Sequence, residues 1–173
     1  TGKMDYRPNV DAVLWFVNDV WPMVRAQAPD ATFWIVGQAP TPPVRALDGR
    51  DGVHVTGAVA DTRPYIAGAR VYVAPLRMGG GTRFKLLEAL ALRRPIVSTR
   101  IGAEGFPLQN GRDALLADGP QAFADSVCRL LQDSDLSDRL AATGRALVAA
   151  RYDWSVIVPK LEALWADILS RRP

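Results

Sequence analysis

Three consecutive glycines, Gly79, Gly80 and Gly81, stand where a predicted strand gives way to a predicted helix. Glycine adds no side-chain packing and is costly to order, so three in a row indicate that another group approaches this backbone closely. The unpaired N–H groups of a helix N-terminus carry partial positive charge and can bind a phosphate. The stretch PLRMGGGTRFKLLEAL therefore predicts an anion site, for which a diphosphate is the natural ligand.

Charged side chains near the glycine loop extend the predicted site. Glu88 falls in the second turn of the predicted helix, and its carboxylate can accept two hydrogen bonds, which suits the vicinal hydroxyls of a ribose. The phosphates and the pentose of one nucleotide would then lie at neighbouring points of the same helix. The basic residues that could add positive charge to this rim are Lys3, Arg7, Arg77, Arg83 and Lys85.

Each of these features also has a plain structural interpretation. A glycine-rich loop between a strand and a helix often serves only the turn, basic side chains are usually solvated, and a single helical Glu is by default a surface residue. The loop is neither a Walker loop nor a GxGxxG fingerprint, because no GK[ST] follows and the glycine spacing differs. The motif alone does not decide between these interpretations.

Strands and helices must alternate along the chain to position these residues. The predicted strands cover residues 31–37, 53–57, 69–75, 95–99 and 113–118. The predicted helices cover residues 9–27 with Asn9 as N-cap, 44–47, a short stretch after Asp61, 83–92, 121–132, 135–151 and 155–170. This alternation predicts one doubly wound, Rossmann-like α/β domain with a parallel sheet and a helical C-terminus over residues 1–173.

The apolar pattern of the helix over residues 83–92 predicts which face it buries. We expect Phe84, Leu87, Leu90 and Ala91 to line that face, because their spacing follows the helical period.

Glycines follow several of the predicted strands, at the edge of a parallel sheet where ligands bind. Gly2, Gly37 and Gly57 join the glycine loop there and predict a cleft. The opening segment TGKMDY resembles the loop that follows a first strand. We therefore expect that strand to lie mostly upstream of Thr1 and the sequence to be a fragment of a longer protein.

Composition and residue counts exclude several classes of function. The 21 basic and 18 acidic residues are scattered, so the net charge of +3 does not suggest nucleic-acid binding. Cys128 and His54 are the only residues of their types, so a disulfide framework, a Cys/His zinc site and a Cys–His catalytic pair all lack partners. We expect Cys128 to pack inside a helix and His54 to lie on a strand surface. No DxD-like pattern suggests a metal site, and the sequence has no membrane-spanning run or signal peptide.

Four segments carry a resemblance that runs nearly end to end: RPNVDAVLWFVNDVWPMV, ATFWIVG, VHVTGAVADTRPYIAGARVYVAPLRMGGGTRFKLLEALALRRPIVSTRIGAEGF and RYDWS. In this order and spacing they resemble the C-terminal half of retaining GT-B-fold glycosyltransferases of the large family 4 group, the group 1 glycosyl transferases. The resemblance implies a donor-binding domain that pairs with an N-terminal, acceptor-binding Rossmann-like domain. It also implies a nucleotide-diphosphate sugar as donor substrate, with no metal and no other cofactor.

The resemblance assigns roles to particular residues. Glu88 matches the second acid of a pair separated by seven residues and would hold the donor ribose, whereas Gly80 stands where the first acid is usual. Lys3 matches the first member of a basic pair that faces the diphosphate, and Arg7 could replace the second. The implied catalytic residues are Lys3, Arg83 and Glu88. The implied donor-binding residues are Gly2, Arg7, Gly37, Gly57, Val59, Gly79, Gly80, Gly81, Thr82 and Lys85.

The implied reaction is front-face transfer of a hexosyl group, with retention, to a saccharide or lipid-linked acceptor. The fragment alone would bind the donor and show little transfer. We expect the full protein in the cytoplasm, where nucleotide sugars are made, and peripheral association with the inner face of a bacterial membrane stays open.

Three other functions are alternatives to this one. A sugar-nucleotide epimerase can share the fold, but it needs an acid/base carboxylate and usually a His near the donor, and His54 with Glu104 suits that role poorly. A non-catalytic nucleotide-sugar-binding module would explain Gly80. A phosphoacceptor regulator would need acids in the first loop, which is basic instead.

Overall fold

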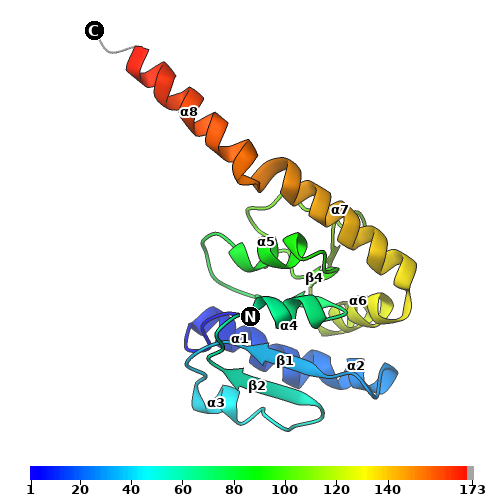
Figure 1. The fold of residues 1–173 in the computed structure, drawn as a ribbon. Coiled ribbons are helices and arrows are strands. Elements are labelled where there is room, and N and C mark those ends of the chain that lie inside the picture. Colours follow the sequence, from blue (N-terminus) through cyan, green and yellow to red (C-terminus); the bar gives the residue numbers. More distant parts are fainter. Residues whose placement is uncertain (171–173) are drawn as a thin grey trace.

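Five short parallel strands form the framework of residues 1–170 (Figure 1). The structure is a computed structural model, and it describes residues 1–170. The strands are β1 (Phe33–Val36), β2 (Val53–Gly57), β3 (Tyr72–Ala74), β4 (Ile96–Ser98) and β5 (Leu115–Leu116). Every pairing among them is parallel, and each strand lies within its predicted range, which confirms the predicted α/β class.

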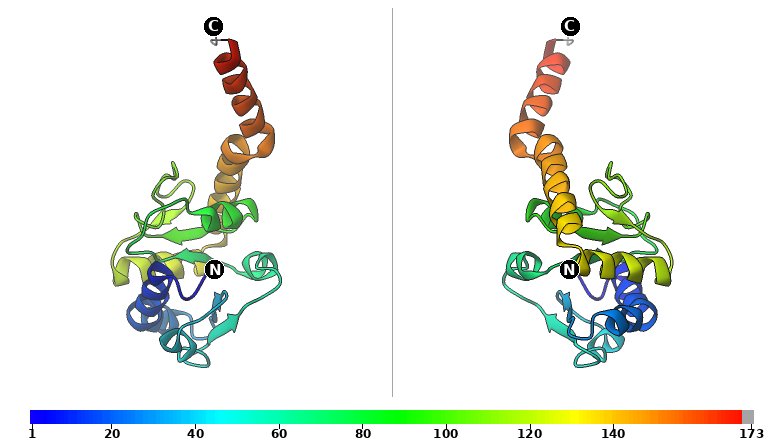
Figure 2. Two further views of the ribbon diagram at one scale, coloured as in Figure 1. Left: turned by 90° about the vertical axis from the view of Figure 1, so that its left-hand side faces the viewer. Right: turned by 90° about the vertical axis from the view of Figure 1, so that its right-hand side faces the viewer.

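These strands make a sheet in two parts. β1 pairs with β2, while β3, β4 and β5 pair in that order, and among residues 1–170 no strand joins β1 to β3. The N-terminus lies between the two parts (Figures 1 and 2). The sheet therefore has a break where a doubly wound fold places its first strand.

The predicted helix over residues 9–27 is in fact three segments. They are α1 (Arg7–Trp15), the π-helix η1 (Phe16–Val20) and α2 (Trp21–Gln27). Pro22 has no N–H to donate to the preceding turn, and the N–H of Trp21 reaches back five residues to the carbonyl of Phe16. The proline thus explains why the α-helical hydrogen bonding is interrupted before α2.

Asn9 is not the N-cap that the sequence predicted. α1 begins two residues earlier, with Tyr6 at the N-cap position and Pro8 in the first turn, where a missing N–H costs nothing. The side chain of Asn9 is buried and makes other contacts, which are described with the site.

The remaining helices are α3 (Pro42–Arg45), α4 (Arg63–Gly68), α5 (Phe84–Ala91), α6 (Pro120–Gln132), α7 (Ser134–Tyr152) and α8 (Trp154–Ser170). They agree with the predicted helices to within a few residues. Asp61 accepts a hydrogen bond from the N–H of Arg63 at the start of α4. No helix of residues 1–170 is long and apolar enough to cross a membrane.

The larger hydrophobic cluster of the core lies between β1, the first helices and α6, and it extends to residues of β4, β5 and α7. Phe16 contacts Phe33 with ring centroids 4.5 Å apart and meets Phe123 edge-on at 5.9 Å. Trp15 packs edge-on against Phe123 as well, at 5.7 Å. Cys128 is buried in this cluster, as predicted, and burial raises the pKa of its thiol. A second cluster gathers Leu86, Leu90, Ile96 and their neighbours under α5.

The buried face of α5 differs from the prediction. Leu86, Ala89 and Leu90 are buried, whereas Phe84 is 66% exposed. FKLLEALA carries two overlapping apolar stripes, and the close approach of α7 selects one of them. At Gly144 of α7, a Cβ atom would lie only 2.5 Å from Leu90 Cδ2, so Leu90 faces that helix directly.

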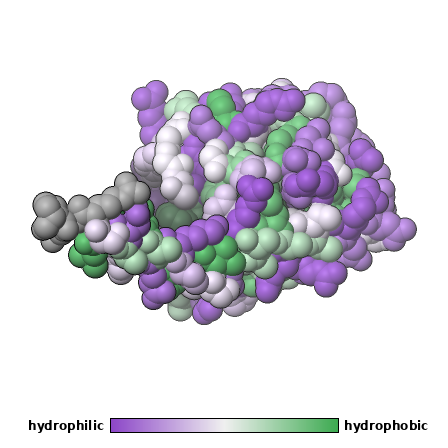
Figure 3. Space-filling view, turned by 90° about the horizontal axis from the view of Figure 1, so that it is seen from above, coloured by the Kyte–Doolittle hydropathy of each residue, from purple (hydrophilic) through white to green (hydrophobic). Residues whose placement is uncertain are grey.

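α8 leaves the body of the protein. None of its residues is buried, and its large apolar side chains include Trp154, Leu164 and Trp165, which are 78%, 54% and 57% exposed. Figure 2 shows the helix continuing outward from α7. Seen from above, hydrophobic side chains lie at this end of the molecule, beside the grey residues (Figure 3).

Phe123 should be a main support of the larger cluster. We expect Phe123→Ala to lower the free energy of unfolding by about 3–5 kcal/mol, because it leaves a cavity among Trp15 and Phe16. Phe84→Ala is the matched control and should cost less than about 1 kcal/mol, since that ring is mostly in solvent. Urea unfolding followed by tryptophan fluorescence measures both. Equal losses would contradict the assigned core.

Candidate functional site

The side-chain amide of Asn9 connects three segments at the edge where the strands end. Its Nδ2 donates to the Lys3 carbonyl oxygen at 2.8 Å, and its Oδ1 accepts from Lys85 Nζ at 2.8 Å. The N-terminal segment, α1 and α5 are therefore held at one point. This role differs from the predicted one, because an Asn before an apolar helix is typical of an N-cap.

Two glycines allow the N-terminal segment to pass close to the end of β1. The Gly2 N–H donates to the Val36 carbonyl at 3.0 Å, and a Cβ atom on Gly37 would lie 1.7 Å from the Gly2 carbonyl oxygen. No side chain fits between these backbones, so Gly37 is required for the contact. Gly57, at the end of β2, pairs with Val36, which places it beside the same edge, and Val59 is half-buried in the loop that follows.

The three loop glycines differ in what surrounds them. Gly79 has a φ of +108°, and a Cβ atom there would lie 3.0 Å from Pro8 Cγ, so this residue packs the loop against α1. Gly81 also has a positive φ, of +89°, but faces open space. Gly80 has open space around it and no positive φ, so a side chain would fit there without strain.

Arg83 forms hydrogen bonds to the glycine loop from its buried side. Its Nη1 donates to the Gly80 carbonyl at 2.9 Å and its Nη2 to the Gly79 carbonyl at 2.6 Å, and the residue is only 6% exposed. The guanidinium thus supplies donors to carbonyls that the glycine loop leaves unpaired. Its Nε is buried without a hydrogen-bond partner among the described residues. The sequence predicts that this charge faces the ligand, whereas in the structure both Nη atoms donate to carbonyls of the loop and Nη2 also donates to the Ile101 carbonyl at 3.4 Å.

Lys85 is the half-buried cation of the rim. Burial lowers the pKa of its ammonium group to about 8, the nearby Arg83 charge lowers it further, and the Glu88 carboxylate acts in the opposite sense. Glu88 itself is exposed, one turn along α5. An anion arriving beside Lys85 would favour the charged form of the amine that burial disfavours.

Thr1 lies beside β3. Its Oγ1 and the Tyr72 hydroxyl form a hydrogen bond of 2.8 Å. Burial raises the pKa of the Tyr72 hydroxyl. The N-terminal segment therefore reaches into the space beside β3.

The other predicted basic residues are less closely engaged. Lys3 is 58% exposed in its side chain and pairs with Asp5 at 3.6 Å. Arg7 is exposed at the first residue of α1, and Thr82 is exposed in the glycine loop. Arg77 is taken up by Asp11 through two hydrogen bonds, of 2.5 and 3.0 Å, which raise the pKa of its guanidinium. In this structure the Arg77 guanidinium is therefore paired with the Asp11 carboxylate.

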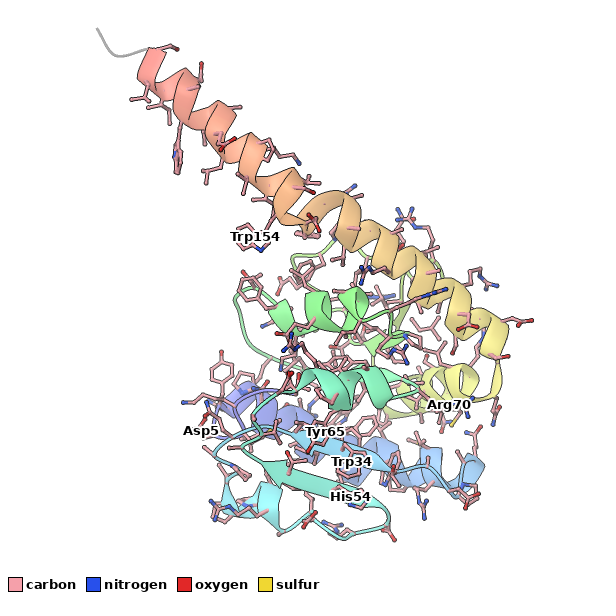
Figure 4. All side chains as sticks on the ribbon, viewed as in Figure 1. Asp5, Trp34, His54, Tyr65, Arg70 and Trp154 are labelled. Atoms are coloured by element: carbon pink, nitrogen blue, oxygen red, sulfur yellow. The ribbon has the colours of Figure 1, made fainter. Side chains whose placement is uncertain are left out.

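His54 lies on the surface of β2, as predicted. Its ring stacks on the Trp34 ring with centroids 4.4 Å apart, and the ring centroids of Trp34 and Tyr65 are 5.9 Å apart (Figure 4). Within residues 1–170, no group of three or more His, Cys, Asp and Glu side chains could hold a metal ion.

This geometry defines an α/β domain of parallel strands whose glycine-bearing ends surround a half-buried lysine and a helix N-terminus. A family model described as "Glycosyl transferases group 1" matches residues 1–133. The chain belongs to this family, which confirms the resemblance found in the sequence.

Relatives and solved structures agree with the family. The chain is 30% identical over 156 residues to the phosphatidyl-myo-inositol mannosyltransferase of Mycobacterium leprae, covering 87% of this chain and 41% of that protein. The C-terminal domain of a glycosyl transferase group 1 family protein (LpcC) from Francisella tularensis has a TM-score of 0.69 at 19% identity, covering 89% of this chain and 84% of that one. HepE from Anabaena, solved with UDP, has a TM-score of 0.69 at 16% identity, covering 86% of this chain and 45% of that one.

The structural likenesses show the fold, which is that of the Rossmann-like C-terminal domains of GT-B glycosyltransferases. The chain spans only 20% to 41% of the length of the curated relatives compared with it.

The lowered pKa of Lys85 predicts a pH dependence of stability. Lys85 binds its proton more weakly in the folded chain than in the unfolded chain, where its pKa is near 10.5, so the free energy of unfolding should rise between about pH 8 and 10.5. The gain relative to Lys85→Met should be at most about 3 kcal/mol. Urea unfolding at several pH values measures it. Lys160→Met, an exposed control, should follow the wild type, and parallel curves for wild type and Lys85→Met would refute the burial of this amine.

Proposed function

We propose that this domain binds the nucleoside diphosphate part of a nucleotide-sugar donor, for retaining transfer of a hexosyl group. The observation that carries the proposal is Lys85, half-buried and held by Asn9 where the glycine loop enters α5. Membership of the group 1 glycosyltransferases supports it, as does the UDP in the structure of HepE.

The diphosphate would lie across the open side of the glycine loop. Gly80 and Gly81 have free space beside their backbone. The N–H groups of Phe84 and Lys85, at the start of α5, donate to no carbonyl or side chain within residues 1–170. Donors of this kind, together with the Lys85 ammonium, match the oxygens of a phosphate.

The ribose would then extend along α5 to Glu88. This carboxylate is exposed, and its charge acts on Lys85, so it lies near the same rim. An acid without a competing ion pair in the described chain is free to accept the two ribose hydroxyls. The base would enter between the loops that begin at Gly37 and Gly57.

Catalysis would rest on charge fixed before the reaction. As the bond from the sugar to the phosphate breaks, negative charge grows on the leaving diphosphate, and Lys85 with the first N–H groups of α5 would stabilise it. Arg83 would act by fixing the loop, and Lys3 could turn from Asp5 toward the phosphate. The departing phosphate would take the acceptor proton. The acceptor, a saccharide or a lipid-linked sugar, would be bound by another domain of the longer protein, in the cytoplasm.

Gly80 favours a second candidate, a domain that binds nucleotide sugars without transferring them. At this position the structure offers space but no side chain to contact the donor sugar. A folded domain that binds the nucleotide but does not distinguish its sugar would fit that function.

Titration of the domain with UDP and GDP by calorimetry tests the nucleotide site. We expect one of them to bind, and Glu88→Ala, Lys85→Met and Lys3→Ala each to weaken binding at least about tenfold, which is about 1.4 kcal/mol. Glu162→Ala and Lys160→Met, exposed on α8, are the matched controls and should leave binding unchanged. If neither nucleotide binds to folded protein, the donor-site assignment is wrong.

Gly80→Glu tests the missing acid. The side chain fits into open space, so the variant should fold as well as Gly80→Ala does. We expect it to bind a nucleotide sugar more tightly than wild type while its affinity for the free nucleoside diphosphate stays unchanged, because only the sugar gains a contact. The ratio of the two dissociation constants, by calorimetry, is the measurement. An unchanged ratio would place residue 80 away from the donor sugar.

A further inference from the structure

Lys85 is the one lysine of this chain whose side chain is not exposed. The sequence contains three lysines, Lys3, Lys85 and Lys160. Lys3 and Lys160 are exposed, whereas Lys85 is half-buried and its Nζ donates to Asn9 Oδ1 at 2.8 Å. A Cβ atom on Gly2 would lie 3.3 Å from this Nζ, so the amine packs against the backbone of the N-terminal segment. Little room is left for water on that side.

The hydrogen-bond partner of this amine is neutral. Among the residues that the structure describes, Lys85 forms no ion pair. A carboxylate partner would hold the proton on the amine, whereas the Asn9 amide oxygen carries no charge. Burial, followed by the nearby Arg83 charge, lowers the pKa of Lys85 to about 8, and the Glu88 carboxylate acts in the opposite sense. The neutral amine, which is the nucleophilic form, is therefore present near neutral pH.

Donors for an anion lie on the same turn of α5. The N–H groups of Phe84 and Lys85 donate to no carbonyl or side chain of residues 1–170, and a side chain at Gly80 or Gly81 would meet open space. Behind the loop, Arg83 Nε is buried without a hydrogen-bond partner in the described part of the chain. Because Lys85 supplies both one of the N–H groups and the amine, a phosphate at this helix end lies within one side-chain length of Nζ.

An acyl phosphate matches both features. Its phosphate is an anion for the helix end, and its electrophilic carbonyl carbon is one oxygen atom away from that phosphate. We propose that Lys85 is an acylation site for acyl phosphates, which bind through their phosphate at the N-terminus of α5 and transfer the acyl group to Nζ.

The transfer balances without a further reactant. The lone pair of the neutral Nζ attacks the carbonyl carbon, and a C–N bond forms while the C–O bond to the phosphate breaks. The phosphate leaves with the electron pair of that bond and takes up the proton that the nitrogen loses. The first N–H groups of α5 stabilise the charge of this leaving group. The products are an uncharged acyl-lysine and inorganic phosphate.

Acylation removes the positive charge of Lys85. The amide that forms has no charge to offer a diphosphate, so donor binding becomes responsive to the supply of acyl phosphates. This consequence rests on the proposed function, whereas the acylation itself does not.

Mass spectrometry of the chain treated with acetyl phosphate tests the acylation. At about pH 8, where roughly half of the Lys85 amine is neutral, the initial rate of acetylation at Lys85 should be at least about tenfold that at Lys160 and at Lys3. A rate at Lys85 no higher than at these two exposed lysines overturns the proposal.

A second reagent separates phosphate binding from the reactivity of the amine alone. Acetic anhydride acylates amines but carries no phosphate. The preference for Lys85 over Lys160 should be at least about threefold greater with acetyl phosphate than with acetic anhydride, and inorganic phosphate should lower it only for acetyl phosphate. Equal preferences with both reagents overturn the phosphate-bound step.

Variants connect the modification to nucleotide binding. By calorimetry, the acetylated chain should bind UDP or GDP at least about tenfold more weakly than the untreated chain and should match Lys85→Gln, which imitates an acetyl-lysine. Lys85→Arg offers no lysine amine, so the same treatment should leave its own affinity unchanged. A loss of affinity in treated Lys85→Arg would assign the effect to Lys3 and overturn the proposal.

The two proposals fail in different ways. If the untreated chain binds neither nucleotide, the nucleotide site is wrong, and the acetylation rates still decide the acylation. If a nucleotide binds but Lys85 is acetylated no faster than Lys160, the acylation alone is wrong.

Discussion

The bridge made by Asn9 is the constraint on which the rest of the rim depends. Three parts of the chain that are far apart in sequence meet at one buried amide, because its oxygen accepts from Lys85 and its nitrogen donates to the Lys3 carbonyl. A buried amide with both ends satisfied holds its partners in one arrangement, whereas a half-satisfied one would be costly. The position of the lysine, and of the backbone that precedes α1, follows from it.

The glycine loop is shaped by a different set of contacts. Gly79 packs on Pro8, and Arg83 fills the inner side of the loop with donors for its carbonyls. The outer side, at Gly80 and Gly81, stays open. A positive side chain buried behind the loop can thus act on a ligand through the electric field and through loop rigidity, without touching it.

Much of the fold could be predicted from the sequence, because the strands follow short apolar runs that are bounded by Gly, Pro or Asp and that form strands in the structure. The helix over residues 9–27 could not be divided correctly, since the π-helix depends on how Pro22 meets the turn before it. Phe84 was misplaced because α5 has two apolar stripes, and only the approach of α7 selects between them. Such choices are made by tertiary contacts.

The site was predictable in its residue types more than in its contacts. Glycines at strand ends and the lysine of α5 do come together. The roles of Asn9, Arg77 and Arg83 could not be predicted, because each depends on a partner distant in sequence: Lys85, Asp11, and loop carbonyls that only the folded backbone presents.

The division of the core into two clusters bears on cooperativity. α6 packs against α2 and also contacts β4, so it connects the two halves, whereas β1 and β3 are not joined by any strand within the described chain. The larger cluster itself extends across both parts of the sheet, because it includes Val97 of β4, Leu115 of β5 and Leu140 of α7. Shared side-chain packing should therefore make both parts unfold in one cooperative transition, although no backbone hydrogen bonds join β1 to β3.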